Sequence, residues 1–446
     1  MKNVFIKKIE WALVFVLIMS LIGCGGGNNP MFNEEDLKAK STQLAVEMET
    51  GNFDNVAAVF SEETAKKLDK QSLQTGWNQT VEELGAYKTV NSVVFAQKGD
   101  KASVVVILLY EKNGLKVTFT YNENEEIEGL WINYASPDQP LAETEVYKEE
   151  VIKIEAGEFQ LDGRLTIPKN VKKPPVVILV QGSGQSDMDE TIGPQGNKTF
   201  QDIAYGLAEK GIASVRYNKR YYQYPDSATD SITIQDEVID DVNVAIDLAS
   251  NEKRLDSERI YILGHSLGGM LAPEIAYKNN KVAGIIVLAG TPRKLEDVIL
   301  QQNKDAIEAM TDKSTEEKMA LLESVLPEIE KIRQVNNDTP HTTILGINSE
   351  YWNSLNQINT PEILKDIHIP MFFLQGEEDF QVDVNTDFVM WKNLLEGRPE
   401  ARFKSYPGLN HLFMSSNGLR DISEYNIKGH VDDIVIEDIA KWIDEN

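Results

Sequence analysis

The stretch best suited to chemistry is the run G-H-S-L-G-G at residues 264–269, which places Ser266 among glycines. An apolar run at 260–263 precedes it, and a helix-like run at 270–276 follows it. A sharp strand-to-helix turn of this kind needs small neighbours, strains the backbone at the serine and exposes its hydroxyl. The pattern predicts a nucleophile at Ser266, whereas the alternative is an ordinary Gly-Ser turn.

A serine hydroxyl is a weak nucleophile, so it needs a base within hydrogen-bond reach and a carboxylate that orients the base. Asp379 follows the strand-like run 371–375, and His411 follows the run 401–406. We expect His411 to take the proton of Ser266 and later return it to the leaving group. We expect Asp379 to fix the tautomer of the imidazole and to stabilise its charged form.

Other residues compete for the roles of base and acid. The chain holds five histidines. His265 lies inside the turn, and its side chain should point away from the site, so His430 is the main alternative to His411. Three other carboxylates near Asp379 are alternative acids: Glu377, Glu378 and Asp383.

The tetrahedral intermediate of acyl transfer needs two backbone N–H groups that bind its oxyanion. Leu267 follows the nucleophile and should supply the first donor. The second should come from the loop after the β-branched run 176–180, which reads Q-G-S-G from Gln181. We expect Ser183 to be this donor, with Gly182 as the alternative.

With these motifs in the order Ser, Asp, His, the chain from about residue 150 to the end resembles an α/β-hydrolase of the serine esterase or peptidase kind. The resemblance implies a doubly wound, mostly parallel sheet within residues 149–446. Strand-like runs that alternate with helix-like runs agree with such a sheet. Amphipathic helical patterns at about 293–366 exceed what this fold needs and resemble a helical cap, which would shape the substrate site.

Several residues depart from the family pattern. The family often reads H-G-S-G-P-x-D-R-D where this chain reads Q-G-S-G-Q-S-D-M-D at 181–189, and an aspartate is common where Asn218 stands. These departures put the shape of the oxyanion loop in question. We expect the neighbouring cations Arg216 and Lys219 to be structural ion-pair partners rather than groups that bind substrate.

Residues 33–135 read differently from the rest of the chain. Helix-like stretches come first, and four runs with a two-residue period follow, with G-D at 99–100 and N-G at 113–114 as turns. This order predicts an α+β domain. The stretch resembles the small cone-shaped domains of the nuclear-transport-factor-like superfamily, and residues 136–148 read as a linker.

The first residues resemble a bacterial lipoprotein signal. Lysines at the start precede an apolar run at 11–22, which ends in L-I-G-C at Cys24. The resemblance implies a signal peptide at 1–23, an acylated Cys24 and a tether at 24–32. We therefore expect a protein anchored by lipid to the extracytoplasmic face of the cell membrane.

The composition limits the remaining possibilities. The chain has 446 residues, a hydrophobic fraction of 41% and a formal net charge of −27, which argues against a nucleic-acid partner. It carries no phosphate-loop or metal-ligand motif, so we expect no cofactor and no metal. We predict a serine hydrolase and favour a carboxylesterase acting on short or medium acyl esters. The alternatives are a peptidase, an acyltransferase or a non-catalytic binding protein, and no feature indicates an oligomeric state.

Overall fold

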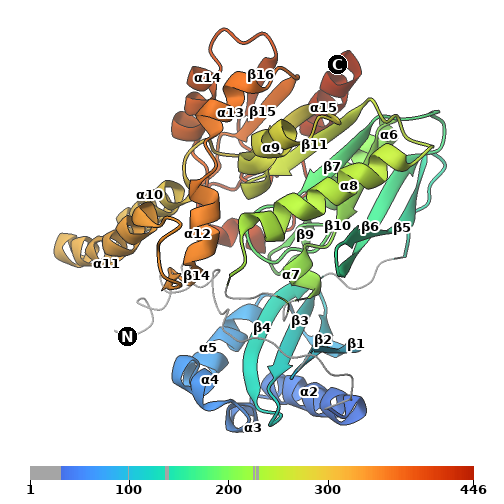
Figure 1. Cartoon of the computed structure of the whole chain (residues 1–446). Coiled ribbons are helices and arrows are strands. Elements are labelled where there is room, and N and C mark those ends of the chain that lie inside the picture. Colours follow the sequence, from blue (N-terminus) through green and yellow to red (C-terminus); the bar gives the residue numbers. More distant parts are fainter. Residues whose placement is uncertain (1–31, 99, 136–139, 225–226, 228–230) are drawn as a thin grey trace.

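The computed structural model describes residues 32–98, 100–135, 140–224, 227 and 231–446 (Figure 1). The expected signal peptide, Cys24 and the tether up to residue 31 lie outside the described residues. Among the described helices, none combines the length and the apolar character needed to cross a membrane.

The N-terminal part has the predicted α+β order, with helices first and a four-stranded antiparallel sheet after them (Figure 1). Asn33 begins the first helix, because its side chain accepts hydrogen bonds from two backbone N–H groups. Trp77 and Phe119 are buried in the core between helices and sheet. The elements are α2 (Glu34–Glu49), α3 (Phe53–Ala58), α4 (Glu62–Lys67), α5 (Lys70–Val81), β1 (Tyr87–Lys98), β2 (Lys101–Tyr110), β3 (Gly114–Tyr121) and β4 (Ile127–Ala135).

The larger part is built on an eight-stranded sheet with the order β16-β15-β12-β11-β7-β10-β6-β5. The first six strands in that order are parallel, and β6 joins them antiparallel to β10. This is the predicted doubly wound α/β sheet. β5 begins at Tyr147, two residues inside the expected linker 136–148. The strands are β5 (Tyr147–Ala156), β6 (Phe159–Pro168), β7 (Val176–Val180), β10 (Ala213–Tyr217), β11 (Ile260–His265), β12 (Val282–Leu288), β15 (Met371–Gly376) and β16 (Ala401–Tyr406).

Helices cover both faces of this sheet, because the central strands are apolar on both sides. Alternate residues of β7 enter two different cores: Ile178 packs in the core that includes Val242 of α8, and Leu179 packs in the core that includes Phe200 of α6. Because the six strands are parallel, their carboxyl ends lie at the same edge of the sheet, and ligands bind at this edge in such folds. The covering helices are α6 (Thr199–Glu209), α8 (Asp240–Asn251), α9 (Leu267–Lys278) and α15 (Asp433–Glu445).

A helical insert separates β12 from β15 in the chain, as the sequence predicted. Its first two helices form a pair that projects to one side of the sheet (Figure 1). The insert comprises α10 (Leu295–Glu308), α11 (Thr315–Gln334), β13 (Thr343–Ile344), β14 (Ile347–Asn348), α12 (Ser349–Asn356) and α13 (Thr360–Asp366).

The remaining short elements lie in loops of the larger part. They are β8 (Thr191–Ile192), β9 (Asn197–Lys198), α7 (Arg220–Gln223), the π-helical turns η2 (Gln235–Ile239) and η3 (Val384–Phe388), α14 (Val389–Leu394) and the 3₁₀ turn η4 (Ile422–Asn426).

Candidate active site

Ser266 lies at the sharp turn between β11 and α9. Its φ is 54° and its ψ is −114°, a conformation that costs free energy for a residue with a side chain. The flanking glycines are required, because a Cβ on Gly264 would lie 2.1 Å from the carbonyl oxygen of Gly268, and one on Gly268 would lie 2.1 Å from that of Val180. The structure therefore has the strained strand-to-helix turn that the sequence predicted.

His411 and Asp379 meet after β16 and β15. The Nδ1 of His411 donates to the Oδ2 of Asp379 at 2.7 Å, and both side chains are buried. The other carboxylate oxygen, Oδ1, accepts from the backbone N–H groups of Gln381 and Val382 at 2.7 and 2.9 Å. The ring orientation of His411 is therefore fixed, and its Nε2 is the nitrogen available as a base.

The alternative bases and acids have other partners. His430 is a surface residue, 72% exposed, that pairs with Asp202. Among the alternative acids, Glu377 accepts from Ser405 and Glu378 pairs with Arg420. The structure brings His411 together with Asp379 and with none of these carboxylates.

His265 connects the serine turn to the loop that carries His411. Its Nε2 donates to the backbone carbonyl of His411 at 2.9 Å, and its Nδ1 lies 2.9 Å from the Oε1 of Glu190. Burial lowers the pKa of His265, but the Glu190 carboxylate, the backbone carbonyl of His411 and the charge of Asp379 together outweigh burial and leave this pKa raised. As predicted, His265 is directed into the protein rather than toward a substrate, but it also anchors His411.

Glu190 was not identified from the sequence. It is buried and has a positive φ of 50°, which is unusual for glutamate. Its Oε1 accepts the backbone N–H of Gly182 at 2.7 Å, in addition to its contact with His265. The only local signal for Glu190 is its place directly after the Q-G-S-G-Q-S-D-M-D segment.

The contact with Glu190 corrects one expectation about the oxyanion hole. The N–H of Gly182 already has an acceptor, so Gly182 cannot serve as the alternative donor. Leu267 is the first residue of α9, where a backbone N–H has no acceptor within the helix. Ser183 is exposed. The loop that carries it lies beside Ser266, since a Cβ on the preceding Gly182 would lie 3.2 Å from the Cβ of Ser266. Leu267 and Ser183 therefore remain the two expected donors of the oxyanion hole.

Two residues that depart from the family pattern, Gln181 and Asn218, make hydrogen bonds that hold the loop at 181–189 in place. Gln181 is buried, and its side-chain amide donates to the carbonyls of Tyr217 and Asp187. The side-chain oxygen of Asn218 accepts the N–H of Met188 at 2.9 Å. Both residues thus connect the oxyanion loop to the end of β10.

The two cations at the end of β10, Arg216 within the strand and Lys219 after it, are in ion pairs, as expected. Arg216 is buried and donates to Glu149 and Asp189, at 2.5 and 2.8 Å. Lys219 pairs with Glu237 at 2.6 Å and also donates to the carbonyl of Gly182 at 2.9 Å, a contact that the sequence did not predict.

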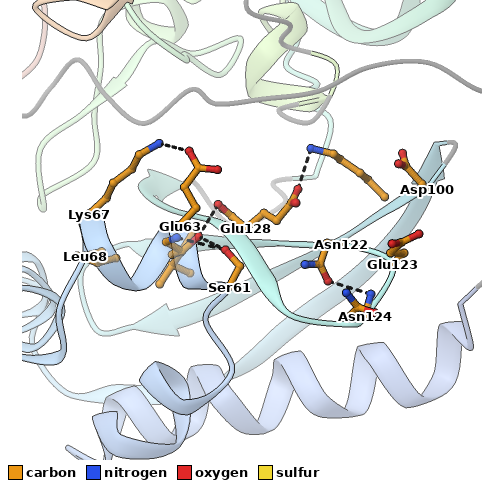
Figure 2. Close-up of a pocket in the computed structure, with 13 residues that line it drawn as sticks. Ser61, Glu63, Lys67, Leu68, Asp100, Asn122, Glu123, Asn124 and Glu128 are labelled. Carbon is orange, nitrogen blue, oxygen red and sulfur yellow. Dashed lines mark hydrogen bonds and ion pairs between the residues drawn. The ribbon is translucent and has the colours of Figure 1, made fainter.

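A cavity of about 230 Å³ lies on the N-terminal domain, away from these residues (Figure 2). It lies beside α4, and two ion pairs line it: Lys67 with Glu63, and Lys101 with Glu128, both at 2.7 Å. Within the described residues, no group of three or more His, Cys, Asp or Glu side chains could hold a metal ion. The cavity contains none of the residues expected to do chemistry.

Comparisons with known proteins show which proteins the chain is similar to. The family model described as "Serine aminopeptidase, S33" matches residues 196–417, and one described as "Protein of unknown function (DUF3887)" matches residues 41–130. Esterase EstD of Thermotoga maritima is 33% identical over 396 residues, which are 88% of this chain and 92% of that protein.

Solved structures with partial similarity include two esterases. Est1E from Butyrivibrio proteoclasticus aligns with 66% of this chain and 98% of its own at 15% identity and a TM-score of 0.43. The Pyrococcus furiosus esterase Pf2001 aligns with 67% of this chain and 91% of its own at 14% identity and a TM-score of 0.42. The family assignment rests on EstD, because its similarity spans both domains. The chain therefore belongs to the same esterase-type family of α/β-hydrolases as EstD.

Proposed function

We propose that the protein hydrolyses carboxylic esters with short or medium acyl groups through an acyl-enzyme on Ser266. The observation that carries this proposal is the fixed His411–Asp379 pair, held through His265 to the strained turn that presents Ser266. The likeness to EstD, an esterase similar over most of its length, favours esters as substrates.

The reaction has two halves. The Nε2 of His411 takes the hydroxyl proton while the Oγ of Ser266 attacks the ester carbonyl carbon, and the N–H groups of Leu267 and Ser183 hold the oxyanion. The C–O bond to the alcohol breaks, and His411 returns the proton to the leaving oxygen. Water, activated by the same histidine, then cleaves the acyl-enzyme and frees Ser266.

A second candidate is peptide hydrolysis with the same residues. It is favoured by one observation, the match of residues 196–417 to a family described as a serine aminopeptidase. The insert at 293–366 would select between ester and peptide substrates, because it lies close to the catalytic residues. Gln302 of its helix α10 donates to the carbonyl of Gln381, in the turn that carries Asp379, at 3.0 Å.

We also propose that the mature protein is anchored at Cys24 on the extracytoplasmic face of the cell membrane. The support is the sequence alone: a positive start, an apolar run too short to span a bilayer comfortably, and L-I-G-C at its end. Acyl chains rather than a spanning helix would provide the anchor.

The test uses purified protein lacking residues 1–24, a fluorescent fluorophosphonate, p-nitrophenyl esters of increasing acyl length and aminoacyl p-nitroanilides. Wild type should be labelled and should hydrolyse the esters faster than the anilides. Ser266→Ala should lose labelling and at least about 10³-fold in kcat. Ser72→Ala, an exposed serine of the N-terminal domain, should behave as wild type. Absence of labelling in folded wild type would refute the proposal, and faster anilide cleavage would select the peptidase.

A further inference from the structure

We propose that Lys219 is a positioning residue for the oxyanion hole, and that Tyr351 of the insert holds it in place through Glu237. The inference rests on the proposed hydrolase function and identifies the groups that orient one of its donors. None of the three residues is placed to touch the reacting atoms.

The contact between Lys219 and Gly182 fixes a peptide plane. The Nζ of Lys219 donates to the carbonyl oxygen of Gly182 at 2.9 Å, and Lys219 is only 3% exposed. A trans peptide unit is planar, and its C=O and N–H point in opposite directions. Because Lys219 holds the carbonyl of Gly182 from inside the protein, the N–H of Ser183 is directed the other way, toward the exposed side of the loop.

Gly182 needs this restraint because glycine can rotate where other residues cannot. A Cβ on Gly182 would lie 3.2 Å from the Cβ of Ser266 and 3.3 Å from the Oε1 of Glu190, so a larger residue would crowd the site. Glu190 fixes the peptide plane before Gly182 by accepting its N–H at 2.7 Å, and Lys219 fixes the plane after it. Without Lys219, the peptide between Gly182 and Ser183 could turn and present a carbonyl oxygen, which would repel an oxyanion.

The ammonium of Lys219 is itself held by Glu237. Its Nζ lies 2.6 Å from the Oε1 of Glu237, and the Oε2 of Glu237 accepts the hydroxyl of Tyr351. Burial raises the pKa of Tyr351, and the Glu237 carboxylate raises it further, so the tyrosine remains a hydrogen-bond donor. A buried ammonium is costly unless it is paired and hydrogen-bonded, so Lys219 depends on both neighbours.

This chain of contacts crosses from the insert to the sheet. Tyr351 belongs to α12 of the insert, whereas Glu237 belongs to the π-helical turn η2 that leads into α8. A second hydrogen bond, from the N–H of Ile234 to the Oγ of Ser354 at 2.9 Å, joins the residue just before η2 to α12. Correct seating of α12 and correct orientation of the Ser183 donor are therefore linked.

The test compares Lys219→Met, the charge-balanced double variant Lys219→Met/Glu237→Gln, and Tyr351→Phe with wild type. The double variant leaves no unpaired buried carboxylate, so it keeps the test valid if the single variant does not fold. For a p-nitrophenyl ester, kcat should fall about 10- to 100-fold in the lysine variants and about 3- to 10-fold in Tyr351→Phe, with KM nearly unchanged. The inhibition constant of a trifluoromethyl ketone, which forms a tetrahedral oxyanion on the serine, should rise by the same factors.

Matched controls come from the N-terminal domain. Lys40→Met removes a lysine that donates to the carbonyl of Glu125, and Tyr110→Phe removes a hydroxyl that donates to Glu49. Both should leave kcat and the inhibition constant as in wild type.

Each outcome separates the inference from the function that it rests on. Full kcat and unchanged ketone inhibition in the folded double variant, with Ser266→Ala inactive, would overturn the role of Lys219 alone. Activity that survives Ser266→Ala would overturn the proposed hydrolase function instead. A rise in KM without a fall in kcat would show that Lys219 acts on substrate binding, which also contradicts the inference.

Discussion

At the scale of single residues, the carboxylate of Glu190 has an unusual position. It meets a histidine in the buried interior and, with the same oxygen, accepts the N–H of Gly182. Because the Nε2 of His265 faces a carbonyl, it must donate, and the carboxylate beside Nδ1 favours a proton on that nitrogen as well. The pKa of His265 is raised for this reason, and this predicts how stability depends on pH.

We predict that Glu190→Gln changes the pH dependence of the free energy of unfolding. In wild type the raised pKa of His265 gives a stabilising contribution that is complete below about 6.5, the value for unfolded histidine, and is lost as pH rises through the raised pKa. In Glu190→Gln, burial still lowers this pKa, and only the His411 carbonyl and the Asp379 carboxylate still raise it, so that contribution should shrink. Urea unfolding between pH 6 and 9 should show a smaller loss of stability in the variant.

The surface pair of His430 and Asp202 provides the control. Asp202→Asn removes the carboxylate from an exposed histidine, where solvent screens the interaction, so the slope of stability against pH should match that of wild type. If the free energy of unfolding had the same slope against pH in wild type and in Glu190→Gln, this would contradict a pKa of His265 that Glu190 raises.

The residues differ in how far the sequence could identify them. Ser266, Asp379 and His411 were identifiable because each stands in a short local motif after a strand-like run. Glu190 and Lys219 were not, since their roles depend on partners such as His265 and Gly182 that are distant in the chain and meet them only in the fold.

At the scale of elements, the close contact of α9 with the central strands determines which residues the turn tolerates. The helix begins so near to β7 and β11 that backbone atoms touch at Gly264 and Gly268. Backbone cannot move aside as the end of a flexible side chain can. The turn thus depends on glycine for reasons of space as well as of conformation.

We predict that Gly268→Ala destabilises the protein by at least about 3 kcal/mol, because overpacking against backbone forces α9 away from β7. Gly397→Ala is the matched control: its Cβ would meet nothing within 4 Å, so only the strain of a φ of +76° remains, about 1–2 kcal/mol. Urea midpoints measured by far-UV circular dichroism give both values. Losses of equal size would show that the backbone contact at Gly268 is not limiting.

Element prediction succeeded where the pattern was long or regular. The β-branched run Val176–Val180 was read as a strand with the bounds that the structure has, and the helices of 293–366 were expected from their amphipathic period. The short hairpins β8–β9 and β13–β14 escaped detection, because two-residue strands show no period. The amphipathic pattern of 234–250 indicates one continuous helix, and nothing in it shows the π-helical turn that places Glu237.

At the scale of the whole molecule, the N-terminal domain packs against the part that carries the site. Lys116 of β3 donates to the carbonyl of Tyr222 and lies 3.9 Å above its ring, and Asn133 of β4 donates to Gln185 at 3.4 Å. Gln185 belongs to the oxyanion loop, so this domain lies beside the candidate active site. Contacts between domains cannot be read from either sequence pattern alone, because neither half shows which surface it presents.

We predict that the full-length protein, expressed in a bacterium with lipoprotein processing, incorporates labelled palmitate and enters the detergent phase of Triton X-114. Cys24→Ser should remove the label and leave the protein in the aqueous phase, because no other cysteine exists to accept an acyl chain. Asn28→Ser, a change within the tether, should partition as wild type. Wild type without label in the aqueous phase would rule out the proposed anchor.

The order of strands in the sheet has a consequence for the time at which the enzyme first becomes active. A ribosome-bound chain that has emerged through β12 already holds β7, β10 and β11, and with them the serine turn and its oxyanion loop. It still lacks Asp379, and it lacks His411, which follows the edge strand β16 near the end of the chain. We therefore expect a growing chain to be inert, so that a cell making this hydrolase is spared its activity until β16 and the segment that carries His411 have been made.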